Sequence, residues 1–153
     1  MVADRPALLE RLVAFPARLA AAAQVAREPP AGEWSSPEVV RHLVAVEEEV
    51  WHARLDQLAA AVRWDAPQWH HTEPPPRVLP DPSLAAALAA FAEHRAATVS
   101  RLSSLDVPGW ARTGRHDTYG LLDVDGLVRL AVDHDDEHLV SLTRAASRTT
   151  AAT

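Results

Sequence analysis

WDAPQWHHTEPPPRVLPDP, residues 64–82, contains six prolines and separates two long segments that have helical periodicity. A proline-rich chain is stiff and extended, and it rises about 3.1 Å per residue. These 19 residues therefore reach roughly 55–60 Å, whereas a helix of about 27 residues is only about 40 Å long. The stretch is long enough to run the whole length of a helical bundle. The helices before and after it can therefore point in the same direction.

Periodic apolar residues predict four helices, two on each side of this stretch, at about residues 6–26, 36–63, 83–105 and 121–146. Pro16 predicts a kink or a break in the first, because proline removes an amide donor and crowds the preceding turn. Ser36-Pro37-Glu38 predicts a sharp start of the second. Since the other links are short, they favour antiparallel neighbours. We therefore expect an all-α four-helix bundle of up-down-down-up order over residues 1–147, followed by a disordered tail at 148–153.

The composition restricts the chemistry that the chain can perform. Its 153 residues suit one domain, and the absence of cysteine leaves any metal to histidine and carboxylate ligands. The net charge is −6 and the arginines form no basic run, so we expect no nucleic-acid partner. The N-terminal MVADRPALLERL lacks the apolar core of a signal peptide, and no apolar run is long enough to span a bilayer. We therefore expect a cytoplasmic protein that contacts no membrane.

Two histidines lie one helical turn apart in AVDHDDEHLV, residues 131–140. At about 100° per residue, His134 and His138 both lie in the middle of the apolar stripe of their predicted helix, and most of the acids point elsewhere. Two stacked imidazoles on such a stripe bury polar nitrogens, and protonation of both would bring like charges together. One cation bound by both rings removes this conflict, whereas satisfied core histidines are the structural alternative.

His42 is the third candidate ligand. It lies at the edge of the apolar arc of the helix at 36–63, about six residues from the start of that helix. His134 and His138 lie about nine to thirteen residues from the end of the last helix. If the two helices are antiparallel, these depths agree to within a turn or two. The pattern therefore predicts that the three histidines converge near one end of the bundle.

Three longer stretches occur in an order that is typical of a known family. They are REPPAGEWSSPEVVRHLVAVEEEVW at 27–51, FAEHRAATVSRLSSL at 91–105 and GRHDTYGLLDVDGLVRLAVDHDDEHLVSL at 114–142. Together they resemble the DinB-like (YfiT-related) four-helix-bundle superfamily over nearly the whole chain. The resemblance implies an up-down-down-up bundle in which His42, His134 and His138 hold a divalent metal, with zinc or nickel expected.

The same resemblance implies a metal-dependent enzyme that acts on a small-molecule substrate. Family members of known activity are often transferases or isomerases that use a low-molecular-weight thiol, whose pKa a metal lowers. The alternative is a non-catalytic metal-binding or protein-interaction bundle, and a homodimer is a further option. HDDEH also matches the H-x-x-E-H pattern of inverted zinc proteases, with Glu137 as the base, but the distal acidic ligand has no clear candidate.

Further side chains are candidates for the surroundings of the metal. Glu49 lies seven residues after His42 on nearly the same helical face, where it would position a water or act as a general base. Its alternative is a solvated place in the acidic run at 47–49. Arg115 and His116 precede the last helix and are candidates to bind an anionic group of a cofactor. The remaining histidines are expected to be exposed: His52, His70, His71 and His94.

Overall fold

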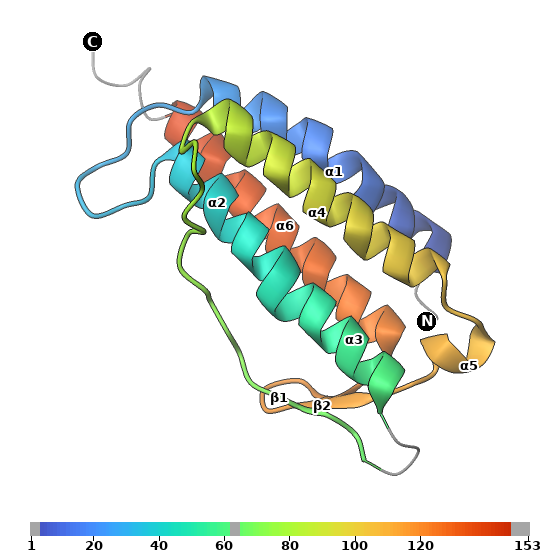
Figure 1. Cartoon of the computed structure of the whole chain (residues 1–153). Helices are drawn as coiled ribbons and strands as arrows, with labels where there is room; N and C mark the ends of the chain where they lie inside the picture. Colours follow the sequence, from blue (N-terminus) through green and yellow to red (C-terminus); the bar gives the residue numbers. More distant parts are fainter. Residues whose placement is uncertain (1–3, 62–64, 148–153) are drawn as a thin grey trace.

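The computed structural model describes residues 4–61 and 65–147. Its helices are α1 (Arg5–Val25), α2 (Ser36–Val46), the π-helix η1 (Glu47–His52), α3 (Ala53–Ala60), α4 (Leu84–Ser103), α5 (Val107–Trp110) and α6 (Val124–Ser147). α2, η1 and α3 form one continuous rod. Figure 1 shows α1 and α6 running in one direction and the α2–α3 rod and α4 in the other. The mostly helical, up-down-down-up bundle matches the prediction, and the proline-rich stretch is the crossover from α3 to α4.

The helix boundaries differ from the predicted ones at several points. α1 runs through Pro16 without a break. The N-cap of α2 is Ser35 and not Ser36, because the Ser35 hydroxyl accepts the Glu38 amide while the Glu38 carboxylate accepts the Ser35 amide. α3 ends at Ala60, and the predicted helix end at residue 63 and the predicted tail at 148–153 lie outside the described residues.

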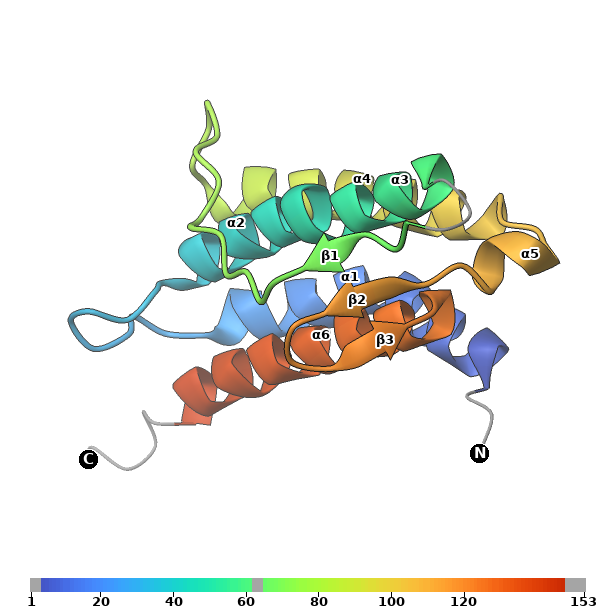
Figure 2. The same cartoon turned by 90° about the horizontal axis from the view of Figure 1, so that it is seen from below.

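Three short strands, which the sequence analysis missed, form a sheet. β1 (Gln68–Trp69) pairs parallel to β2 (Gly114–His116), which pairs antiparallel to β3 (Gly120–Leu122). Strands of two or three residues are too short to show the alternating pattern by which strands are predicted. Because β3 occupies residues 120–122, α6 begins later than predicted. Figure 2 shows the sheet lying across the side of the bundle between the α2–α3 rod and α6.

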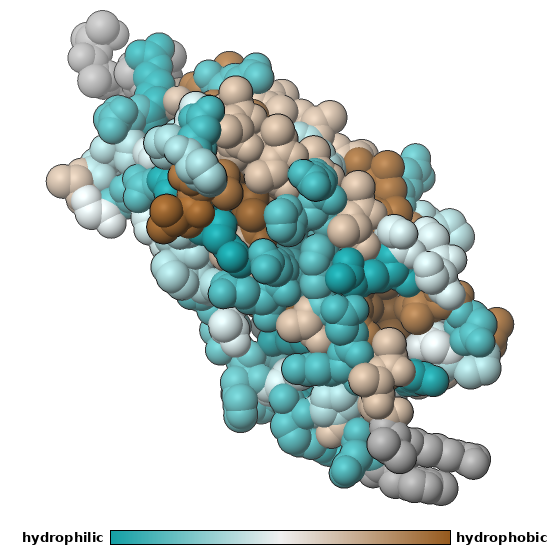
Figure 3. All heavy atoms as spheres, viewed as in Figure 1, coloured by the Kyte–Doolittle hydropathy of each residue, from teal (hydrophilic) through white to brown (hydrophobic). Residues whose placement is uncertain are grey.

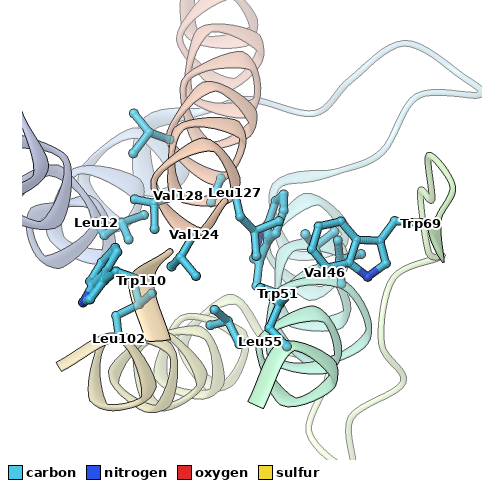
Figure 4. Packing of buried hydrophobic residues seen from close by; sticks show 14 residues of the cluster. Leu12, Val46, Trp51, Leu55, Trp69, Leu102, Trp110, Val124, Leu127 and Val128 are labelled. Atoms are coloured by element: carbon cyan, nitrogen blue, oxygen red, sulfur yellow. The ribbon is translucent and has the colours of Figure 1, made fainter. Parts of the chain in front are cut away.

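The apolar core consists of two clusters. One gathers Trp51, Trp69 and Trp110 with leucines and valines of the long helices (Figure 4). The other surrounds Phe15 and Phe91, whose rings meet edge to face with centroids 5.7 Å apart. Trp69 comes from the crossover and covers Gly114, where an added Cβ would lie 2.3 Å from the indole ring. The crossover is thus anchored in the core by a large apolar side chain.

The surface carries scattered apolar side chains. On the face shown in Figure 3, hydrophobic residues form small separate patches among hydrophilic ones. The large exposed apolar residues are Val13, Val25, Trp34, Val78, Val107, Tyr119, Leu121 and Val140. Within residues 4–61 and 65–147, no helix combines the length and the hydrophobicity that a membrane span requires. Single exposed apolar residues are ordinary on folded proteins, so the homodimer stays a prediction.

A buried ion network joins the long helices. The Arg95 side chain is only 2% exposed and donates hydrogen bonds to both Glu47 and Asp135, with nitrogen–oxygen distances of 2.7–3.2 Å. It also donates to the Leu12 carbonyl at 3.1 Å. Burial raises the pKa of Asp135 to about 6, against the attraction of Arg95. Glu47 continues the rod that carries His42, and Asp135 adjoins His134, so this network fixes the backbone on both sides of the candidate site.

His52 contacts this network through Thr98, whose hydroxyl donates to Glu47, although His52 was expected at the surface. It is buried, and its Nε2 lies 3.0 Å from the His94 carbonyl oxygen and 2.8 Å from Thr98 Oγ1. Since a carbonyl only accepts, Nε2 carries the hydrogen. Burial lowers the pKa of His52, and the positive charge of Arg101 adds to this effect. The folded protein therefore favours neutral His52.

We expect His52→Gln to reduce the acid sensitivity of the fold. An unfolded histidine gains a proton near pH 6.5, whereas folded His52 resists protonation until a lower pH. The stability that neutral His52 contributes is thus present above pH 6.5 and is lost as the pH falls. The unfolding free energy of the native protein should fall more steeply between pH 6.5 and 5 than that of the variant, by up to about 1.4 kcal/mol per pH unit. Urea titrations in chelator would measure this, with His70→Gln as an exposed control; equal slopes would contradict it.

Candidate metal centre

Four side chains from α2, the crossover and α6 converge between the α2–α3 rod and α6. They are His42, Glu73, His134 and His138, and each offers one ligand atom within 4.8 Å of the others. Ring centroids lie 4.9 Å apart for His42 and His138 and 4.5 Å apart for His134 and His138. The structure therefore brings together the three histidines that the helical spacing selected, and it adds a carboxylate from the crossover.

The His42 ring is held in one tautomer. Its Nδ1 lies 2.6 Å from the Pro74 carbonyl oxygen, which can only accept, so Nδ1 carries the hydrogen and Nε2 presents a lone pair. Nε2 is buried without a hydrogen-bond partner among the described residues, yet it lies 3.0 Å from Glu73 Oε2. The short contact does not have the geometry of a hydrogen bond. Two acceptors this close repel one another unless a proton or another cation lies between them, so the arrangement fits a metal ion.

The two histidines of α6 are in the form that binds metals. Their Nε2 atoms face each other at 3.3 Å, and His134 Nε2 lies 3.4 Å from Glu73 Oε1. Burial lowers the pKa of both rings, and that of His138 falls to about 3 with a further contribution from the charges of His134 and His42. Neutral imidazole is the ligand form, so protons compete weakly for these two nitrogens at neutral pH.

The structure does not bring Glu49 to this cluster. Glu49 is exposed, because residues 47–52 form a π-helix whose wider turns shift every later residue away from the face expected for an α-helix. Glu73 occupies the carboxylate position instead. Sequence reasoning missed it because an irregular crossover has no periodicity that predicts where a side chain points. One feature of the sequence could have indicated Glu73 as a ligand, namely its closeness to His70 and His71 in a segment rich in prolines.

A cavity of about 180 Å³ opens beside the cluster, and His134 and Glu73 belong to both. His116 lies on its wall, is buried, and accepts the Thr118 amide at Nδ1 over 3.0 Å. Burial lowers the pKa of His116, and the charge of Arg54 adds to the effect. Arg115, by contrast, is exposed and is not among the residues that line the cavity. Of the two residues predicted to bind an anionic cofactor group, only His116 reaches the cavity.

Two tryptophans flank the histidine rings. The Trp34 ring lies 4.7 Å from that of His42, and the Trp51 ring lies 6.3 Å from that of His134. Trp51 is buried and lines the cavity, whereas Trp34 is partly exposed. The tryptophans thus shield the cluster from two sides.

Comparison with known proteins assigns the chain to a family. Residues 4–141 match a family model described as the DinB superfamily. The chain belongs to the DinB superfamily. Among solved structures, this DinB-superfamily protein is similar to YfiT from Bacillus subtilis, with a TM-score of 0.74 and 19% identity over 98% of this chain and 90% of the other. YfiT is described as a probable metal-dependent hydrolase with an unusual four-helix bundle topology. No curated protein matches the sequence.

Proposed function

We propose that this DinB-superfamily protein is a metal-dependent enzyme that holds a divalent ion, expected to be zinc or nickel, through His42, His134 and His138. The observation that carries the proposal is the pair of acceptors, His42 Nε2 and Glu73 Oε2, that lie 3.0 Å apart beside two facing imidazoles. The description of YfiT as a probable metal-dependent hydrolase supports it as well.

The cavity supports an enzyme over a non-catalytic metal site. A structural metal has all its positions filled by protein, whereas a catalytic metal keeps one position for substrate or water. The three histidines leave a position free, and the cavity of about 180 Å³ adjoins them. The fourth candidate ligand, Glu73, comes from the irregular crossover and has a side chain that is 43% exposed. Such a carboxylate can leave the site when a substrate enters.

Each residue of the site has a separate role in the proposed reaction. A divalent metal held by the three histidines would lower the pKa of a thiol or water at its free position. Glu73 lies beside this position and would be the residue to accept the proton that the thiol or water gives up. Pro74 holds the His42 ring through its carbonyl, and Trp51 excludes bulk water from the cavity wall. The family resemblance favours a thiol-cofactor transferase or isomerase, whereas the carboxylate of Glu73 favours water, and thus hydrolysis, as the second candidate.

The test begins with elemental analysis of the native protein purified without a histidine tag, which should contain about one equivalent of zinc or nickel. The loaded protein is then incubated with electrophiles plus mycothiol, bacillithiol or glutathione, and separately with esters and amides without thiol. Metal-dependent turnover that requires a thiol supports the transferase, and turnover without one supports the hydrolase. Metal binding with no turnover in either series, and no thiol-induced change in the nickel spectrum, would favour the non-catalytic alternative.

A further inference from the structure

Arg54, on α3, is a buried cation on the wall of the cavity. It is only 6% exposed, and within residues 4–61 and 65–147 it forms no ion pair with a carboxylate. Its Nη2 donates to the His70 carbonyl at 2.9 Å. The guanidinium carbon lies 5.6 Å from the Trp51 ring centroid and 5.4 Å from that of Trp69. One carbonyl and two aromatic rings thus hold a charge that proteins usually pair with an anion.

Burial makes this arrangement unfavourable for the charged side chain. Desolvation lowers the pKa of Arg54, and Asp117 attracts it without forming an ion pair in the described part of the chain. Arginine nevertheless keeps its charge in proteins and offers a planar fork of donors that matches a carboxylate. The fold therefore maintains an unpaired guanidinium beside the candidate metal centre, where an anionic ligand would complete its hydrogen bonds.

Two further donors lie on the same wall. The indole Nε1–H of Trp51 is buried without a hydrogen-bond partner among the described residues. His116 accepts a hydrogen bond at Nδ1, so its neutral ring carries the hydrogen on Nε2. Glu73, Asp133 and Glu137 also line the cavity, but all three are exposed and therefore lie toward its mouth. Donors at the buried wall and acids at the mouth select a ligand with a single inward-facing negative charge.

We propose that this cavity binds the carboxylate of a compact monoanionic ligand through Arg54, assisted by Trp51 and His116. The volume of about 180 Å³ equals the space of about six water molecules, which suits a small acid. Val46, Val50 and Leu130 supply an apolar wall for the rest of the ligand. The inference rests on the proposed function, since the ligand is the substrate that would react at the adjoining metal.

The test compares butyrate with its neutral isostere butyramide on the native protein, with and without metal. The signals of the Trp51 indole N–H and the Arg54 guanidinium in NMR titrations would report binding. Even without metal, we expect butyrate to bind at least about 10-fold more tightly than butyramide, since hydrogen bonds to a charged group are strong. Succinate should bind more weakly than butyrate, because its second charge faces Asp133 and Glu137.

Variants provide the second arm of this test. Arg54→Met keeps the length of the side chain but should remove the preference for butyrate over butyramide, and Arg54→Lys should retain part of it. Arg115→Gln removes an exposed positive charge beside His116 and should change butyrate binding by less than about 2-fold. Because Arg54→Met can fail to fold, the butyrate–butyramide comparison on the native protein decides independently. Equal binding of the two probes, or an unchanged preference in a folded Arg54→Met, would overturn the proposal.

The outcomes for the cavity and for the metal centre are separable. A protein that binds no metal but still prefers butyrate through Arg54 would refute the proposed function and leave the carboxylate site intact. Butyrate binding that requires metal and is insensitive to Arg54→Met would mean that the carboxylate contacts the metal, which overturns the inference and leaves the metal centre intact.

Discussion

His138→Ala is expected to abolish stoichiometric binding of zinc or nickel while the helical circular dichroism signal persists. The variant removes one of three imidazoles whose ligand atoms lie within 4.8 Å of one another. Loss of a partner that only orients a ligand costs about 10–100-fold in affinity, so loss of a ligand itself should exceed about 100-fold. His138 lies on α6 but outside the two apolar clusters, so alanine leaves the core packing in place. Isothermal titration of the metal-free protein would measure the change.

Two matched variants define what this result means. His70→Ala removes an exposed histidine outside the cluster and should leave the affinity unchanged. Glu73→Gln should weaken binding but keep the one-to-one stoichiometry, because all three imidazoles remain. A second readout is unfolding: metal at about 100 times its dissociation constant should stabilise the native protein by about 2.7 kcal/mol and His138→Ala hardly at all. Tight binding by His138→Ala would remove this residue from the ligand set.

Arg95→Met is expected to cause the largest loss of stability. Removing one partner of a buried ion pair costs about 3–5 kcal/mol, because the remaining charges lose their counterion and cannot reach water. Here the variant leaves two buried carboxylates, Glu47 and Asp135, without their shared donor. The loss should shrink as the pH falls from 7 toward 5, since Asp135 already has a pKa of about 6 and takes up a proton in this range. Urea titration at several pH values would test both statements.

Arg101→Met is the control for this prediction. Arg101 lies one and a half to two turns further along α4 and pairs with Asp56 at 3.0 Å in an ion pair that is largely open to solvent. Pairs of this kind contribute about 0–1 kcal/mol. If the two methionine variants were equally stable, the buried network would contribute no more than an exposed pair. A triple variant that adds Glu47→Gln and Asp135→Asn to Arg95→Met should recover part of the loss.

The four-helix architecture and the convergence of the three histidines could be predicted from the sequence, because both depend on helical periodicity. The apolar stripe that predicts α6 also places His134 and His138 on its inner face, and the length of the proline-rich stretch predicts the direction of α4. The burial of Glu47 and Asp135 was not predicted, for the opposite reason. Their burial depends on Arg95, which lies far away in the sequence, and a helical pattern of one segment contains no information about its partner. The prediction for Glu49 failed because of the π-helix, since we recognise no sequence pattern that predicts this local change in the helical turn.

The crossover is the segment in which mutations can alter the site without altering the helical bundle. Its backbone supplies the Pro74 carbonyl to His42 and the His70 carbonyl to Arg54. Its side chains supply the Glu73 carboxylate to the cluster and anchor the segment in the core through Trp69. These groups contact residues of the candidate metal centre and also Arg54 of the proposed carboxylate site. None of them belongs to a long helix. Mutations in this one loop can therefore alter reactivity and ligand choice while the four rods keep their packing, which makes it the natural segment to exchange or redesign.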